Sequence, residues 1–166
     1  KTLLHSLPPF LIALTTANST LSLDKNVDIS INKLKEKKEF AEFSIPFAMV
    51  LYKPAGTIYL SVVATYFAMI NGTNISIVWL LSLAVITTIL NIAIPPVNGG
   101  GINNYSILLK ELSLPLTPLP ILIVLDPVIE FVITGFNVYA QTLETYCIAR
   151  TSKNIKGETD EIVNNN

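Results

Sequence analysis

Residues Ile75–Ile94 read ISIVWLLSLAVITTILNIAI and contain no charged side chain. The run lies inside a longer stretch, from Pro54 to Leu109, that also lacks any charged residue. A soluble domain must wet its outer surface, and helices without charges cannot do that. A helical bilayer span needs about 20 apolar residues, which is the length of the quoted run. The sequence therefore predicts an integral membrane protein of the all-α class.

The composition of the whole chain excludes several classes of function. The 166 residues are 51% hydrophobic and 14% charged, with a net charge of −1, whereas soluble domains carry about 25% charged residues. The near-zero net charge leaves no electrostatic footprint for nucleic acid. The single Cys147 and the single His5 argue against a disulfide framework and a His- or Cys-ligated metal cluster. From composition we expect no metal and the lipid bilayer as a partner; the transporter interpretation given below adds a small-molecule substrate, no cofactor and no enzymatic activity.

The two ends of the chain suggest its domain organisation. Lys1 rather than Met opens the sequence, so we expect the C-terminal part of a larger transporter-like protein. Residues 1–152 would form its membrane core. Residues 153–166 are polar and end in NNN, which predicts a solvated cytoplasmic tail.

Proline, glycine and polar clusters interrupt the apolar sequence and set the expected elements. Residues 7–23 hold two apolar halves around TTANST, each too short for a span. This pattern favours a re-entrant hairpin, with a poor amphipathic helix end as the alternative. Next come a solvated charged segment (24–42) and a span (43–70) that is unwound at 53–57 and helical again over 58–70. A turn (71–74), a helix (75–94), a break (94–104), a short helix (105–114) and a loop (113–120) follow. One long helix (121–150) ends the core, and Pro127 is where we expect it to kink.

Basic residues give an orientation. Lys33–Lys38 and the basic residues of 150–156 should share the cytoplasmic side. That requires an even number of full crossings between them. Two spans, at 43–70 and 121–150, with one re-entrant hairpin at 75–114 meet the requirement. The tips of the two hairpins, near 17–19 and 97–101, should then lie close together. The predicted fold is a polytopic all-α membrane protein with two re-entrant helical hairpins, one broken span and one long polar-striped span.

The long helix carries one polar stripe. Its polar residues recur at spacings of three or four, which places them on one helical face. They are Asp126, Glu130, Thr134, Asn137, Gln141 and Thr145. An intramembrane carboxylate is costly and by default marks a site or pathway. The alternative is that the stripe supplies hydrogen bonds between helices.

Three interruptions accompany this stripe, near 17–20, 53–57 and 97–101. A broken helix exposes N–H groups that favour anions and carbonyl oxygens that favour cations. A glycine run also lets bare backbone approach a ligand. The combination of breaks and one polar helix predicts a secondary transporter.

The order of these elements resembles the C-terminal transport core of the dicarboxylate/amino-acid:cation symporters, the glutamate-transporter family. The resemblance covers Leu7 to Ser152. TTANSTLS stands at the family's serine-rich SSSGTLP tip, KPAGT at its NMDGT, and VNGGG followed by ELSLPL at its second hairpin. The final helix follows the family pattern D-x3-D-x2-R-T-x2-N-x3-D, in which Asp126, Thr134 and Asn137 match and Glu130 replaces an Asp.

The resemblance implies the site residues. Glu130 would hold a substrate amino group, and Asn137 would hold a carboxylate or an ion. The substrate-binding set would be Thr16, Asn18, Ser19, Asn98, Gly99, Gly100, Gly101, Glu130, Thr134 and Asn137. The ion or coupling set would be Lys53, Gly56, Thr57, Asp126 and Gln141.

Departures from the family pattern modify the implied function. The family's substrate-gripping Arg falls at Ile133, which favours a neutral amino acid or small polar metabolite over glutamate. A sodium-ligand Asp falls at Gln141, and Lys53 places a fixed cation in the broken span, with Asp126 or Glu130 as its expected partner. Coupling to sodium would therefore be altered or absent, and a coupling cation, sodium or proton, stays open.

The resemblance also implies the mechanism, the partners and the location. The core would move in an elevator-like manner against a scaffold portion of the same protein, in a homotrimer in the plasma or inner membrane. Two other functions stay open at this point. One is a non-transporting scaffold or sensor subunit that kept the fold, and the other, less favoured, is a channel.

Overall fold

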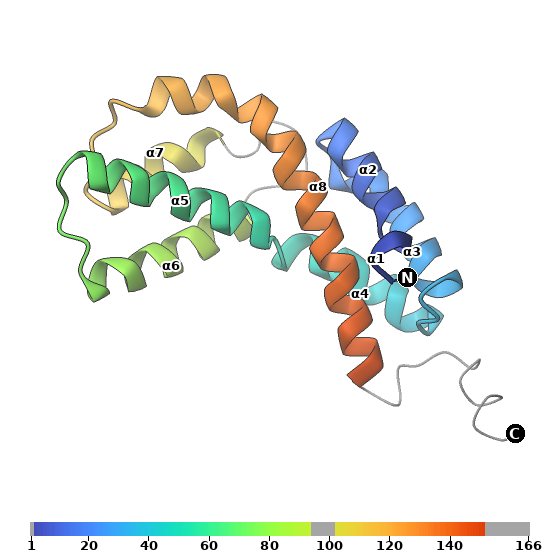
Figure 1. Ribbon diagram of the computed structural model, residues 1–166. Helices are drawn as coiled ribbons and strands as arrows, with labels where there is room; N and C mark the ends of the chain where they lie inside the picture. Colours follow the sequence, from blue (N-terminus) through green and yellow to red (C-terminus); the bar gives the residue numbers. More distant parts are fainter. Residues whose placement is uncertain (1, 94–101, 152–166) are drawn as a thin grey trace, which may run out of the picture.

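The computed structural model describes residues 2–93 and 102–151, and these residues form helices, turns and no strand (Figure 1). The expected tail at 153–166 and the second hairpin tip at 97–101 lie outside the described residues. The helices are α1 (Thr2–His5), α2 (Leu7–Thr16), the 3₁₀ helix η1 (Ser19–Ser22), α3 (Leu23–Asn32), α4 (Lys38–Leu51), α5 (Pro54–Ile70), α6 (Ile77–Ala93), α7 (Ile102–Glu111) and α8 (Leu119–Thr151).

The first hairpin is larger than the sequence predicted. Helix α2 ends at Ala17, whose φ of 49° is left-handed, and η1 then leads into α3. Figure 1 shows α3 returning beside α2, so the returning arm lies at Leu23–Asn32 and not within 7–23. The prediction ended the hairpin too early because the charges from Asp24 onward resemble a solvated loop.

The segment 24–42 is mostly helical, and its charged side chains other than Glu36 are exposed, as predicted for a solvated loop or helix end; its buried inner face was not predicted. Asn26, Ile29 and Ser30 share a buried face of α3, because residues three and four apart lie on one side of a helix. In the connection that follows, Leu34 and Glu36 are both 3% exposed. The lysines point outward while this inner face packs against α4 and α8.

The broken span is confirmed, but its break is shorter than predicted. Helix α4 ends at Leu51 and α5 begins at Pro54, so only Tyr52 and Lys53 are non-helical, instead of 53–57. Proline suits the first turn of a helix, because its fixed φ fits and its missing N–H would have no intrahelical partner. Residues Pro54 to Thr57 therefore start α5 rather than delay it to 58.

Helices α6 and α7 both pack against α5. The predicted helix at 75–94 is confirmed as α6, and α7 starts at Ile102, three residues earlier than predicted, so Asn103 and Asn104 are helical. The two helices have 17 and 10 residues, both fewer than the roughly 20 that a span needs. That these arms turn back within the bilayer stays a prediction.

Helix α8 is the longest element, with 33 residues. It bends in its N-terminal half (Figure 1), the half that contains Pro127, and proline is the usual cause of such a bend. Helix α2 crosses α8 closely at Gly135, where an added Cβ would lie 3.0 Å from the Leu14 Cβ. Phe10 extends this contact through edge-to-face packing on Phe136, with ring centroids 5.4 Å apart.

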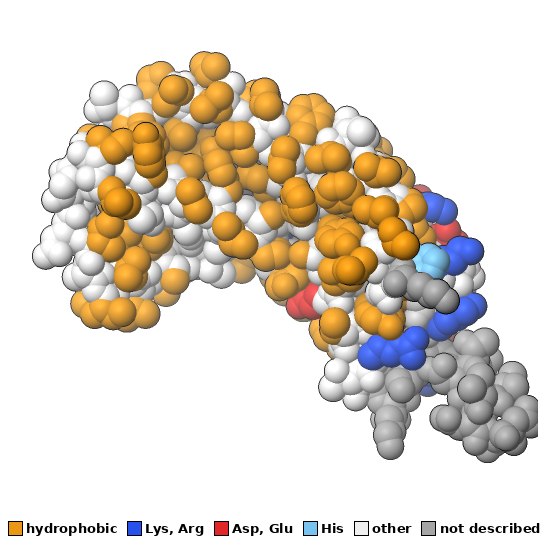
Figure 2. Space-filling model, in the orientation of Figure 1, with side chains coloured by type: hydrophobic (Ala, Val, Ile, Leu, Met, Phe, Trp, Pro, Cys, Tyr) orange, Lys and Arg blue, Asp and Glu red, His pale blue; other side chains and the backbone are white. Residues whose placement is uncertain are grey.

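The surface is that of a membrane protein. Two segments, Lys38–Ile70 and Leu119–Thr151, are long and apolar enough to cross a bilayer, and only 28% and 17% of their apolar windows are buried within the chain. Helices in the core of a soluble protein would be mostly buried. Figure 2 shows hydrophobic side chains over most of the visible surface, with Lys and Arg gathered at one end. The α3–α4 connection and the end of α8 meet at that end (Figures 1 and 2).

Candidate functional site

The candidate site is the break between α4 and α5, which faces the polar stripe of α8. A helix break frees backbone groups that must find other partners when buried. The Gln141 side-chain Nε2 donates to the Tyr52 carbonyl oxygen at 2.9 Å. The Ala55 backbone N–H donates to the Asn137 Oδ1 at 2.9 Å. Two members of the predicted stripe thus hold the two sides of the break.

A third amide reaches the break from α6. Asn91 donates through its Nδ2 to the Lys53 carbonyl oxygen, and also to the Thr57 Oγ1 at 3.0 Å. Gly56 makes this approach possible, because a Cβ there would overlap the Asn91 amide oxygen. Gly56 and Thr57 thus lie at the break, in the first turn of α5, while their role in binding an ion stays a prediction. Sequence reasoning missed Asn91, although it is the only amide side chain in the α6 helix.

Burial makes the arrangement specific. Asn91, Asn137 and Gln141 are 3%, 8% and 1% exposed. A buried amide that lost its partner would cost roughly 1–3 kcal/mol, so these side chains are held in one geometry. The carbonyl oxygens of Tyr52 and Lys53 both receive N–H donors. Each of these two carbonyl oxygens thus has a hydrogen-bond partner from a side chain of another helix.

The rest of the stripe also faces inward. Asp126 and Thr145 are 6% and 2% exposed, and Glu130 and Thr134 are half-buried. Asp126 accepts a hydrogen bond from the Tyr105 hydroxyl of α7. That Lys53 pairs with one of the two carboxylates stays a prediction.

The first hairpin tip lies against α8, but its polar groups bond locally. The Thr16 Oγ1 donates to the Ile12 carbonyl at 2.7 Å, and the Asn18 Oδ1 caps η1 by accepting from the Thr20 N–H at 2.9 Å. Ser19 is buried, at 7% exposed. The four residues predicted in the second tip, Asn98, Gly99, Gly100 and Gly101, lie outside the described residues.

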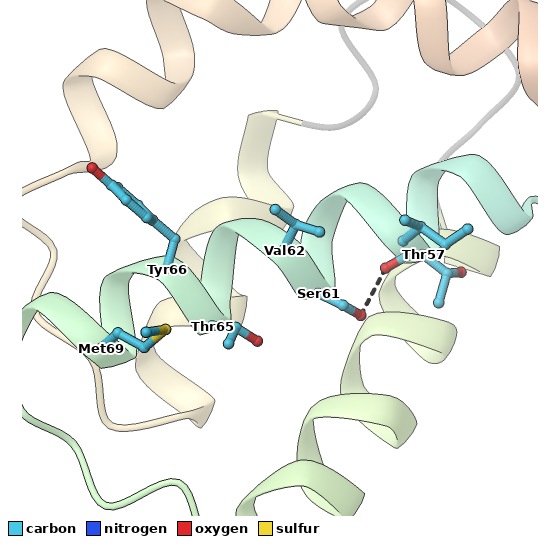
Figure 3. Close-up of a pocket in the computed structure, with 7 residues that line it drawn as sticks. Thr57, Ser61, Val62, Thr65, Tyr66 and Met69 are labelled. Carbon is cyan, nitrogen blue, oxygen red and sulfur yellow. Dashed lines mark hydrogen bonds between the residues drawn. The ribbon is translucent and has the colours of Figure 1, made fainter.

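A groove of about 490 Å³ runs along α5 beside the break (Figure 3). Its lining residues are Thr57, Ile58, Ser61, Val62, Thr65, Tyr66 and Met69. Within it, Ser61 donates to the Thr57 carbonyl at 2.8 Å. Every residue that lines the groove comes from α5, so the groove is one face of that helix. The place where side chains of α6 and α8 meet the start of α5 is the α4–α5 break.

Comparison with known proteins identifies the family. The profile of the "Sodium:dicarboxylate symporter family" matches residues 1–151. Human "Neutral amino acid transporter A" is 23% identical over 141 residues, which cover 85% of this chain and 26% of that protein. Mouse "Neutral amino acid transporter B(0)" is 22% identical over 129 residues, or 75% of this chain and 23% of that protein. An "Uncharacterized symporter" of Haemophilus influenzae is 28% identical over 134 residues, or 80% of this chain and 30% of that protein.

The chain thus spans about a quarter to a third of the length of these relatives. The family match covers all the described helices. Together with the two long apolar helices it marks an integral membrane protein. This chain belongs to the sodium:dicarboxylate symporter family.

Proposed function

We propose that this chain forms the solute-binding core of a secondary transporter for neutral amino acids or similar small polar solutes. The observation that carries the proposal is the break at Tyr52–Lys53, where amides from α6 and α8 converge on freed backbone groups. Breaks of this kind, beside an inward polar helix, form solute and ion sites in transporters. Two of the relatives are named as neutral amino acid transporters, which supports the solute class.

The residue at position 133 supports the same class. Ile133 lies on α8 between Glu130 and Thr134 of the polar stripe, and it is half-buried. An aliphatic side chain cannot pair with a second carboxylate on the solute. A neutral amino acid leaves no such charge unpaired, whereas aspartate or glutamate would lose its water without a counter-charge.

The coupling of transport would differ from that of a sodium symporter. Gln141 and Asn91 present N–H donors to the carbonyl oxygens of the break, where cation binding would require the oxygens to be open. Lys53 adds a positive charge to the same two-residue break. The core would move as a unit, in an elevator-like manner, against a scaffold in the remainder of a longer protein.

Uptake by the full-length protein in proteoliposomes tests this proposal. Radiolabelled L-alanine should accumulate in preference to L-aspartate. Ile133→Arg should raise the apparent affinity for L-aspartate by roughly tenfold or more, because a bidentate guanidinium–carboxylate pair is strong in a dry site. Ile133→Gln is the matched control, since it adds polarity without charge and should leave aspartate uptake low.

Two results would overturn the proposal. Preference of the unmodified protein for aspartate would contradict the solute class. Absence of uptake of either solute, from protein shown to be folded, would favour the scaffold or sensor alternative.

A further inference from the structure

Helix α7 has one buried face that carries a single hydroxyl group. Tyr105, Leu108 and Leu109 of α7, and Leu112 directly after its last residue, are between 0% and 3% exposed, and their spacing puts them on one side of the chain. They pack into the core with residues of α5, α6 and α8. The Tyr105 hydroxyl is the only side-chain polar group among these four residues, so its partner determines how α7 sits on its neighbours.

One partner is a carboxylate of the α8 stripe, and the hydroxyl of Tyr59 on α5 also hydrogen-bonds the Tyr105 hydroxyl. The Tyr105 hydroxyl donates to the Asp126 Oδ1, and the Tyr105 ring packs edge-to-face on Tyr59 of α5, with centroids 6.3 Å apart. The Asp126 Oδ2 is buried and accepts no hydrogen bond from the described residues. A carboxylate in this setting depends on its one donor, because hydrogen bonds to charged groups are worth more than neutral ones.

A second bond fixes the same end of α7 on its other side. The Asn104 Nδ2 donates to the Leu90 carbonyl oxygen of α6 at 2.8 Å. Adjacent residues Asn104 and Tyr105 thus fasten the start of α7 to α6 and to α8. Leu90 precedes Asn91, which holds the α4–α5 break, and Asp126 lies one helical turn before Glu130. The start of α7 is therefore attached to two elements of the candidate site.

We propose that Tyr105 is a positioning residue for solute binding, which acts through Asp126 to hold α7 and the polar face of α8 in register. This inference rests on the proposed function. It assigns to Tyr105 a role in the affinity for the solute and none in contacting it. Loss of the hydroxyl leaves the Asp126 carboxylate buried without its donor, and α7 separates from α8 to let water reach that carboxylate.

Hydrogen exchange of the purified full-length protein tests the attachment. Tyr105→Phe keeps the ring and removes only the donor, so a role in packing alone would leave exchange unchanged. We expect roughly ten- to hundredfold faster exchange of the amides of α7, the range that corresponds to one charge-assisted hydrogen bond. Tyr66→Phe is the matched control, because Tyr66 is 59% exposed, and it should leave α7 exchange unchanged.

A double variant and uptake kinetics complete the test. Tyr105→Phe with Asp126→Leu removes both partners, so exchange in α7 should return towards that of the unmodified protein. For L-alanine uptake, Tyr105→Phe should raise KM roughly tenfold with Vmax within about twofold. Unchanged exchange in Tyr105→Phe would overturn the attachment, and faster exchange with unchanged KM would overturn the role in solute binding. If the unmodified protein took up no L-alanine, the proposed function would fail, while the exchange comparison would still decide the attachment.

Discussion

Two connections in this chain, the α4–α5 break and the α3–α4 turn, differ in how many of their buried polar groups have hydrogen-bond partners. At the break, the carbonyl oxygens of Tyr52 and Lys53 and the N–H of Ala55 all have side-chain partners. Around the α3–α4 turn, several buried side-chain atoms have no partner among the described residues. They are the Asn26 Nδ2, the Ser30 Oγ, the Ser44 Oγ and both carboxylate oxygens of Glu36.

This difference predicts that the α4–α5 break keeps one geometry, whereas the α3–α4 turn adjusts to its surroundings. At the break the Gln141 Oε1 is buried without a partner among the described residues, but the three bonded backbone groups make the break costly to disturb, because movement would leave them unpaired. A region with unpaired buried groups gains from protonation or water entry, and it therefore responds to solution conditions. We infer that the break sets the geometry of the site, while the α3–α4 turn sets how stability varies with pH.

The largest expected effect is at the break itself. Gly56→Val should lower the free energy of unfolding by roughly 3 kcal/mol, because its side chain would displace the Asn91 amide and both of its hydrogen bonds. Thermal or chemical unfolding of the full-length protein in detergent measures this loss.

A double-mutant cycle sharpens this prediction. Asn91→Ala makes room at Gly56, so Gly56→Ala should cost much less in that background than in the unmodified protein. Strict additivity of the two single losses would show that Gly56 and Asn91 are not coupled, and the break would then not be a fixed arrangement.

A smaller effect is expected at the α3–α4 turn. Burial raises the pKa of the Glu36 carboxyl to about 7. The folded state therefore keeps the proton between about pH 4.5 and pH 7, where the unfolded state has released it. Stability should be greatest below this window, should fall by up to about 3 kcal/mol across it, at about 1.4 kcal/mol for each pH unit, and should level off above pH 7. Unfolding measured from pH 5 to pH 8 would reveal the slope.

Two substitutions assign this slope to one residue. Glu36→Gln should flatten the pH dependence, since it cannot ionise. Glu39→Gln, three residues later on an exposed position, should leave the slope as it is. The comparison of the two connections would fail if Glu36→Gln retained the full pH dependence.

Local sequence signals predicted much of this fold. The polar stripe of α8 followed from the helical period, and four of its six residues are buried while Glu130 and Thr134 are half-buried, as that period requires. The α4–α5 break followed from the Lys53–Pro54 pair and Gly56. The length of the break did not follow from the sequence, because proline starts a helix as readily as it stops one.

Tertiary contacts account for what the sequence could not predict. The charged residues of α3 suggested a solvated loop, although every third or fourth residue is buried against α4 and α8. Asn91 and Tyr105 became site residues only because α6 and α7 fold back on α5, and no local pattern shows which polar group they meet. The family resemblance singled out Gln141 because it replaces an Asp of the family pattern. Only the structure shows that its side chain donates a hydrogen bond to the break.

The central claim is that amide donors, and not a bound cation, satisfy the α4–α5 break. The melting temperature of the full-length protein in sodium chloride and in choline chloride, at equal ionic strength, tests it most directly. The unmodified protein should melt at the same temperature in both salts. Gln141→Glu replaces the donor at the Tyr52 carbonyl by a carboxylate, so sodium should raise its melting temperature by bridging the two oxygens. A sodium-dependent rise in the unmodified protein would contradict the account.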